Sequence, residues 1–269
     1  SDAGALLLGA TGCSMFGGPE PEDAFNAFAD ALHRKDSGAA AKDTTDASAS
    51  EPARPRNRSD RAMSVVQTVM GIVDTGRISL PTVIDSMFRP LDPTVAEERL
   101  RWWSTKLVRD AEIDLIVKGR EHTGDGAEPL IVMSNHQSLY DIPVVFRSIP
   151  GKIRMVTKAE LFKVPVWGRA MLAAGFIRID RSDRQQAVDS LREGGGSLLA
   201  AGTRVWIAPE GTRSKTGALG PFKSGGFRMA LETRVRILPV AIDGTRRVLP
   251  AKGVVVHRGQ RVTVTVLPP

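Results

Sequence analysis

The chain has 269 residues, a net charge of +7 at pH 7 and a hydrophobic content of 42%, which is enough for a sizeable core. Its single cysteine, Cys13, excludes an intrachain disulfide and a metal-binding thiol cluster. The positive charge favours an anionic partner such as nucleic acid, an anionic membrane surface or a phosphorylated substrate, although an aromatic content of 5% supplies few platforms for base stacking. No run approaches the ~18 apolar residues of a membrane-spanning helix.

Residues 1–61 are rich in Ala, Gly, Asp, Ser and Pro and differ from the rest of the chain. An amphipathic helix is expected over residues 23–33, and residues 36–61 lack large apolar side chains, so we expect 1–61 to be a low-complexity, disordered tail. The short apolar run before Cys13 faintly resembles the end of a lipoprotein signal. It is too short for a full signal peptide, and no basic residue precedes it.

Residues 62–92 predict a pair of short amphipathic helices. Apolar residues recur at helical spacing from Val65 to Val73, Gly76 is a stop signal, and Ser79 is placed to cap a second helix that Pro90 ends. Such a pair either lies on a membrane surface or packs on the domain that follows.

Residues 93–269 alternate between helical and extended patterns. Helices are expected over residues 93–108, 165–174, 185–201 and 222–233, and strands over residues 113–118, 130–133, 152–157, 177–179, 205–208, 235–242, 254–257 and 262–267. This alternation predicts an α/β fold in which helices flank a mixed central sheet.

A histidine and a carboxylate follow the apolar strand at residues 130–133. The sequence there is Asn-His-Gln-Ser-Leu-Tyr-Asp, with His136 and Asp141 five residues apart and Ser138 as a fair N-cap for a helix that includes Phe146. A bend would bring Asp141 back to the imidazole, fix its tautomer and leave the other ring nitrogen free to take a proton. These are two members of a Ser-His-Asp system, whose nucleophile here could be a substrate hydroxyl. The less specific alternative is a capping or surface histidine.

Three more stretches follow in a fixed order. They are Gly-Phe-Ile-Arg-Ile-Asp-Arg at residues 175–181, Ala-Pro-Glu-Gly-Thr-Arg-Ser at residues 208–214 and Ile-Leu-Pro-Val-Ala at residues 237–241. With the histidine stretch they resemble the four blocks of the glycerolipid acyltransferases, most closely the bacterial type of 1-acylglycerol-3-phosphate acyltransferase. The resemblance covers about residues 100–268. It implies an acyltransferase-like αβ sandwich with His136 and Asp141 as the catalytic pair.

The resemblance also implies a site for the acceptor's phosphate. The substrate-binding residues it assigns are Lys158, Arg181, Glu210, Gly211, Thr212 and Arg213. Arginine suits this role because its planar fork of donors matches phosphate oxygens. Phe222, Lys223 and Gly225 match the family as well. Two positions depart from its pattern: Arg178 stands where an aromatic, proline or aliphatic residue is usual, and Ala208 replaces a bulky residue.

The implied reaction transfers an acyl chain from acyl-CoA or acyl-carrier protein to the sn-2 hydroxyl of 1-acyl-glycerol 3-phosphate (lysophosphatidic acid), giving phosphatidic acid. We expect no cofactor beyond the acyl donor, no metal and no nucleic-acid partner. Bacterial members carry an N-terminal helix pair that dips into the bilayer. We therefore expect residues 62–92 to associate with membrane lipids, residues 93–269 to form the acyltransferase domain, and the protein to be peripheral or monotopic on the cytoplasmic face.

Two other functions stay open from the sequence. One is acyl transfer to another lyso-lipid or to a glycolipid. The other is a basic peripheral protein that binds membranes without catalysis.

Overall fold

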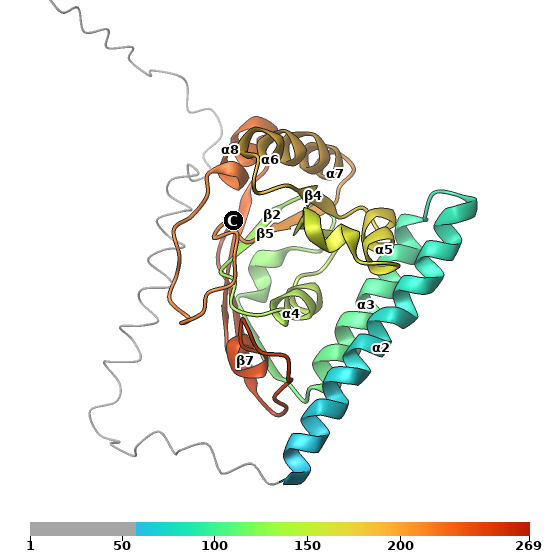
Figure 1. Cartoon of the computed structure of the whole chain (residues 1–269). Coiled ribbons are helices and arrows are strands. Elements are labelled where there is room, and N and C mark those ends of the chain that lie inside the picture. The colour runs from blue at the N-terminus through green and yellow to red at the C-terminus, as the bar shows by residue number, and fades with distance from the viewer. Residues whose placement is uncertain (1–57) are drawn as a thin grey trace, which may run out of the picture.

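The computed structural model describes residues 58–269, so residues 1–57, with the helix expected over 23–33 and with Cys13, lie outside the described part. The described chain forms one seven-stranded sheet in the order β1-β7-β6-β2-β5-β3-β4 (Figure 1). The strands are β1 (Asp114–Lys118), β2 (Ile131–Ser134), β3 (Ile153–Lys158), β4 (Ile177–Ile179), β5 (Arg204–Ile207), β6 (Ile237–Asp243) and β7 (Arg261–Val266). The predicted mixed α/β fold is confirmed.

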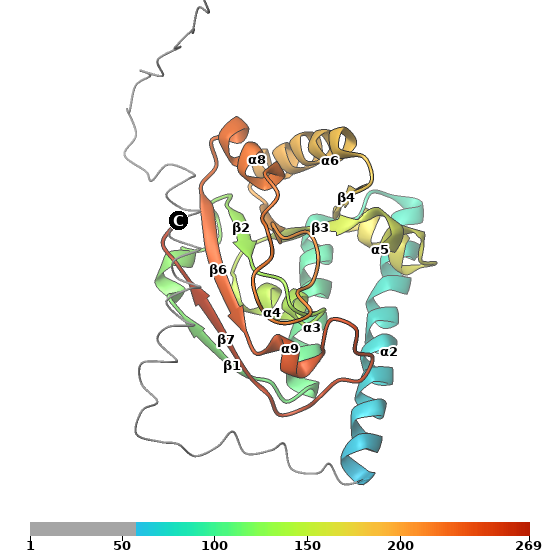
Figure 2. The same cartoon turned by 60° about the vertical axis from the view of Figure 1, so that its left-hand side comes forward.

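Neighbouring strands are parallel except β6 and β7, which run antiparallel. In the middle of the sheet Val132 of β2 is in register with Trp206 of β5 on one side and Leu238 of β6 on the other. Figure 2 shows β6 and β2 lying side by side, and Figure 1 shows β2 next to β5. Because β2 to β6 share one direction, their carboxyl ends meet at the same edge of the sheet, where α/β folds collect ligands.

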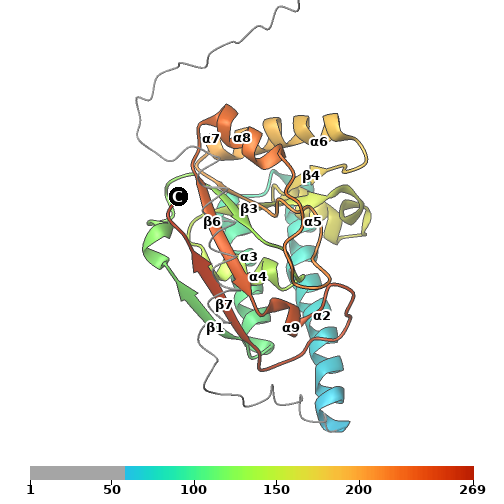
Figure 3. The same ribbon diagram turned by 90° about the vertical axis from the view of Figure 1, so that its left-hand side faces the viewer.

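Helices cover both faces of the sheet. One layer holds α3 (Pro93–Asp110), α4 (Asp141–Ser148) and α5 (Trp167–Ala173), and the other holds α6 (Arg184–Ser190), α7 (Gly196–Ala200) and α8 (Gly225–Thr233). Figure 3 shows α6, α7 and α8 gathered together, away from α4. Along β2 the side chains alternate, so that Val132 packs in the first layer while Ile131 and Met133 pack in the second.

The helix expected over residues 185–201 is present but wider in its middle. A π-helical turn, Leu191–Gly195, joins α6 to α7. A Cβ at Gly195 would lie 2.3 Å from Sδ of Met229, so the absence of a side chain lets this turn pack closely against α8.

The predicted break at Gly76 is wrong, because residues 58–88 form one helix, α2 (Arg58–Phe88), with Pro81 inside it. Ser79 is buried in this helix instead of capping a new one, and the Thr82 hydroxyl bonds back to the Ile78 carbonyl at 2.6 Å. A helix pair does precede the sheet, but its members are α2 and α3. Among the described residues, no helix has the length and apolar character needed to cross a bilayer.

Polar contacts fasten α2 to α3. The buried Asp74 carboxylate lies 3.1 Å from the Lys106 ammonium, and Trp103 Nε1 donates to Thr75 Oγ1 at 3.0 Å. Hydrogen bonds to Asp110 and Asp74 raise the pKa of Lys106, so the ammonium stays charged across the physiological range. Figures 1 and 2 show α2 on the outside of the molecule, alongside α3.

The strand expected over residues 254–257 is absent. The backbone amide of Val256 donates to Thr68 Oγ1 of α2 at 3.1 Å, and that of His257 donates to the Val248 carbonyl at 2.7 Å. Val248 ends the short helix α9 (Thr245–Val248). The apolar segment therefore packs between α9 and α2. The periodicity of the sequence alone cannot distinguish such packing from pairing in a sheet.

Arg204 at the start of β5 is fully buried and carries a structural charge. Its guanidinium donates to three backbone carbonyls, those of Thr123 at 2.7 Å, Pro150 at 2.9 Å and Glu128 at 3.0 Å. Burial lowers the pKa of Arg204, and Glu128 and Asp125 oppose that shift. The side chain thus ties together two connections, the one between β1 and β2 and the one between α4 and β3, beneath the amino ends of the central strands.

We expect Arg204→Met to lower the free energy of unfolding by roughly 3 kcal/mol, because three backbone carbonyls, one buried and two partly buried, lose their donor. Arg236→Met is the matched control. Arg236 is half-exposed and pairs with the Glu128 carboxylate at 2.6 Å, so its loss should cost about 1 kcal/mol or less. Denaturant titration of both variants measures the difference, and equal losses would refute the structural role of Arg204.

Candidate active site

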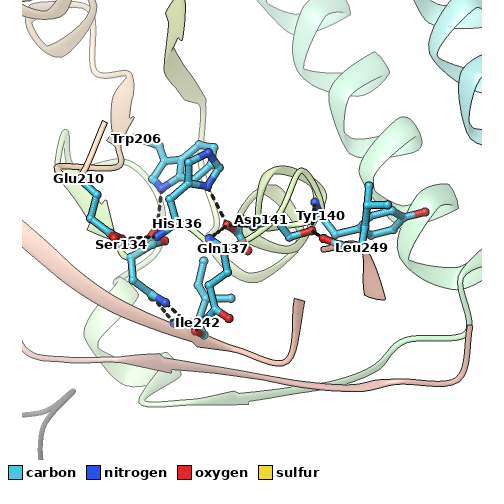
Figure 4. A network of polar contacts seen from close by, with 11 residues as sticks. Ser134, His136, Gln137, Tyr140, Asp141, Trp206, Glu210, Ile242 and Leu249 are labelled. Carbon is cyan, nitrogen blue, oxygen red and sulfur yellow. Dashed lines mark hydrogen bonds and ion pairs between the residues drawn. The ribbon is translucent and has the colours of Figure 1, made fainter. Parts of the chain in front are cut away.

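His136 is the second residue after β2, and Asp141 is the first residue of α4. The predicted bend is present: His136 Nδ1 lies 2.7 Å from Asp141 Oδ2 (Figure 4). The same oxygen accepts the backbone amides of Gln137 at 2.7 Å and Ser138 at 2.9 Å. Asp141 is fully buried, so these three donors replace the water that Oδ2 loses, while Oδ1 is buried without a hydrogen-bond partner.

Ser138 does not cap α4 as predicted. Tyr140 occupies the N-cap position, and the Ser138 hydroxyl accepts the Tyr140 amide at 3.0 Å while it donates to the Leu249 carbonyl at 2.7 Å. The reason is that residues 138–140 form a tight turn before the helix begins. This turn brings Asp141 back under the imidazole.

Two amides of the motif, Asn135 and Gln137, anchor it to β6. The Asn135 side chain donates to the Ile242 carbonyl at 2.8 Å and accepts the Ile242 amide at 2.7 Å. The Gln137 side chain donates to the same carbonyl. Sequence reasoning missed this role, and the only available signal was an amide on each side of the histidine.

The imidazole of His136 keeps one nitrogen for chemistry. Nδ1 faces Asp141, so Nε2 is the free position, and the side chain is 18% exposed and lines a cleft. The ring meets Trp206 edge to face, with centroids 6.2 Å apart. Trp206 is in turn fixed by a 2.9 Å bond from its Nε1 to Ser134 Oγ. The ring is therefore held on two sides and open on a third.

The loop after β5 carries Glu210 to Arg213 and binds the backbone of the histidine. The Ser214 amide donates to the His136 carbonyl at 2.7 Å, and Glu210 Oε1 accepts the His136 amide at 2.8 Å. Glu210 Oε2 accepts the Gly220 amide at 2.9 Å. Of the predicted substrate-binding residues, Glu210 is the one whose side chain bonds to the protein's own backbone on both oxygens.

Two cations converge on Gly211. The Arg181 guanidinium donates to the Gly211 carbonyl, and a Cβ at Gly211 would lie 3.0 Å from Cε of Lys223. With φ at 69°, Gly211 also has a backbone conformation that favours glycine. Partial burial lowers the pKa of Arg181, and Glu160 opposes that shift; a guanidinium nevertheless stays charged at physiological pH.

The cleft has a volume of about 970 Å³ and lies at the shared carboxyl edge of β2 to β5. Lys158, Arg181, Gly211, Thr212, Arg213 and Lys223 line it together with His136. Lys158 also pairs with the exposed Glu160 at 2.9 Å. Apolar lining comes from Leu139, Ile142, Met155, Leu161 and Trp167. The cleft thus offers a cationic region and an apolar region, as an amphiphilic ligand requires.

The two residues that depart from the family pattern, Ala208 and Arg178, lie in different parts of the structure. Ala208 lines the cleft, so its small side chain leaves space there. Arg178 is exposed on the edge strand β4 and is not among the lining residues. Residues 237–241 form most of β6 and are buried in the sheet beside β2.

A family comparison covers this same region. Residues 114–243 match the family model described as Acyltransferase, and all four sequence stretches fall within the match.

Curated relatives share about a third of their residues with the chain. A chloroplastic 1-acyl-sn-glycerol-3-phosphate acyltransferase of Brassica napus is 35% identical over 150 residues, which are 55% of this chain and 43% of that protein. The Saccharomyces cerevisiae 1-acyl-sn-glycerol-3-phosphate acyltransferase is 36% identical over 149 residues, which are 55% of this chain and 48% of that protein. The match spans about half the length of these relatives.

The fold has a solved counterpart as well. The crystal structure of the 1-acyl-sn-glycerophosphate acyltransferase PlsC from Thermotoga maritima superimposes with a TM-score of 0.62 at 22% identity, covering 78% of this chain and 86% of that one. The resemblance expected from the four stretches is confirmed: residues 114–243 match the acyltransferase family model, and the relatives named above are 1-acyl-sn-glycerol-3-phosphate acyltransferases.

Proposed function

We propose that the chain transfers an acyl group from acyl-CoA or acyl-carrier protein to the sn-2 hydroxyl of 1-acyl-glycerol 3-phosphate, giving phosphatidic acid. The observation that carries the proposal is the His136–Asp141 pair, 2.7 Å apart, at the wall of a cleft with cationic and apolar regions. Relatives whose names state this activity support it.

In this proposal the acceptor hydroxyl is the nucleophile. His136 Nε2 takes its proton as the oxygen attacks the thioester carbonyl, so a C–O bond forms and the C–S bond breaks. The proton then passes from Nε2 to the departing thiolate. The Asp141 carboxylate stabilises the imidazolium that exists between the two transfers, and its fixed position keeps Nδ1 protonated throughout.

The acceptor's phosphate would bind the cationic region. Arg181 approaches from the end of β4, Arg213 from the loop after β5 and Lys158 from the end of β3. These cations come from separate strands, so they surround a ligand instead of forming a flat patch. A phosphate monoester gains charge-assisted hydrogen bonds there, while its acyl chain is accommodated by the apolar lining.

We further propose that α2 holds the protein at a membrane. Its inward face is polar, with Ser64, Asp74, Ser79 and Thr82 buried. Its outward face is apolar, with Met63, Val65, Val66, Val69, Ile72, Val73, Leu80, Ile84, Met87 and Phe88 exposed. This arrangement reverses that of a helix on a water-soluble domain and suits an apolar surrounding. The protein would then be peripheral or monotopic on the cytoplasmic face, where acyl-CoA and acyl-carrier protein occur.

His136→Ala should abolish acyl transfer to lysophosphatidic acid, because the base is lost, and the fold should be kept, because the amides of Gln137 and Ser138 still donate to Asp141. Asp141→Asn should lower kcat by a factor on the order of a hundred, because a neutral amide orients the imidazole but does not stabilise its cation. Transfer of a radiolabelled acyl chain measures both. Normal turnover by folded His136→Ala would refute the mechanism.

Arg181→Ala and Arg213→Ala should each raise KM for lysophosphatidic acid more than KM for the acyl donor, because a charge-assisted contact is worth roughly 1.5–3 kcal/mol. Arg178→Ala is the control. Arg178 is an exposed arginine in β4, the strand that precedes Arg181, and it lies outside the cleft lining. It should leave both constants unchanged. A rise in KM for the acyl donor alone would show that the acceptor phosphate binds elsewhere.

Ile72→Asp and Phe88→Asp should release the protein from anionic liposomes, because a carboxylate at the apolar face of α2 opposes insertion. Both side chains are already exposed, at 69% and 83%, so folding should be little affected. Leu231→Asp is the control: Leu231 is 59% exposed but lies on α8. Liposome sedimentation decides the matter, and equal release by all three variants, or by none, would contradict the proposed surface.

A further inference from the structure

Glu210 is a buried carboxylate between two parts of the site. It is 6% exposed, and its two oxygens accept backbone amides at 2.8 Å and 2.9 Å, from His136 and Gly220 respectively. Figure 4 shows the side chain pointing toward the backbone of the histidine turn. A carboxylate turned to backbone donors is stabilised there, whereas beside a phosphate dianion it would be repelled.

The two bonds span the loop that carries Thr212 and Arg213. One joins its beginning to the histidine turn, and the other joins its beginning to its far end at Gly220. The Ser214 amide adds a third bond, to the His136 carbonyl at 2.7 Å. The backbone amide and the backbone carbonyl of His136 are therefore both held by the loop that carries Thr212 and Arg213. The position of the base thus depends on the position of this loop.

Resting on the proposed function, we infer that Glu210 is a positioning residue that fixes His136 relative to the acceptor-phosphate loop, and that it does not bind the acceptor. The acceptor is amphiphilic and its hydroxyl must reach Nε2 while its phosphate occupies the cationic region. A rigid link between the two regions sets the distance between them. Misplacement of reacting groups by about 1 Å costs on the order of a hundredfold in rate.

The test is Glu210→Gln, which keeps the size but replaces one acceptor by an NH2 group that must face a backbone N–H donor. We expect kcat for lysophosphatidic acid to fall about ten- to a hundredfold, while KM for the acceptor changes less than about threefold. The melting temperature should fall by only a few degrees, because one buried amide loses its acceptor while the fold is kept. Glu232→Gln is the matched control, since Glu232 is an exposed carboxylate on α8, and it should change neither constant.

Other outcomes have separate meanings. A rise in acceptor KM with kcat preserved would make Glu210 a substrate ligand and overturn the inference, as would kinetic constants equal to those of the wild type. If Glu210→Gln does not fold, Glu210→Asp takes its place: it keeps the charge but is too short to reach both amides, so the same kcat loss is expected. Absence of turnover by the wild-type protein would instead refute the proposed function.

Discussion

Asp141 places a carboxylate with no solvent exposure next to the imidazole that the proposed chemistry needs. An anion at such a site is stable only when donors replace water. The donors here are the His136 ring and the amides of Gln137 and Ser138, which all reach one oxygen within 2.9 Å. These donors belong to consecutive residues, so the chain must turn tightly around the carboxylate. The same turn that stabilises the buried charge therefore orients the base.

That turn is fixed from outside by neighbouring strands. Asn135 and Gln137 bond to Ile242 at the end of β6, and Ser138 bonds to Leu249 just beyond α9. On the other side, the loop after β5 holds the His136 backbone through Glu210 and Ser214. The histidine follows β2, which lies between β5 and β6 in the sheet. Because β2 has a neighbouring strand on each side, the histidine turn can be anchored on both sides. An edge strand would offer only one.

The sequence predicted that His136 follows a strand and that helices flank a mixed sheet, whereas Lys158, Arg181 and Arg213 were expected in the site only from the family resemblance. Their shared location follows from the parallel pairing of β2, β5, β3 and β4, whose carboxyl ends lie at one edge of the sheet. The sequence did not predict what Glu210 contacts, because a Glu-Gly-Thr-Arg run reads equally as a ligand set or as a turn. The Gly220 amide that completes the Glu210 contacts lies ten residues away, at a position with no distinctive signal.

The errors at residues 76 and 254–257 have one cause. Local patterns record propensity, and tertiary contacts outweigh it in both places. Gly76 has open space around it, so its weak helix propensity is overcome by the polar contacts that hold α2 against α3. Residues 254–257 have the apolar character of a strand but find their partners in Thr68 and Val248 instead of a sheet edge.

The position of α2 connects the membrane proposal with the shape of the cleft. The apolar lining residues Leu161 and Trp167 come from the short helix Ala159–Lys163 and from α5, and α5 packs directly on α2. The apolar side of the cleft is thus adjacent to the helix whose outer face is apolar. The cationic side, at Arg213 and Lys223, comes from the loop before α8. A lyso-lipid drawn from a bilayer against α2 would enter with its acyl chain on the α5 side and its phosphate toward the loop before α8. This orientation would present the hydroxyl of the lipid to His136, which lies between the two regions.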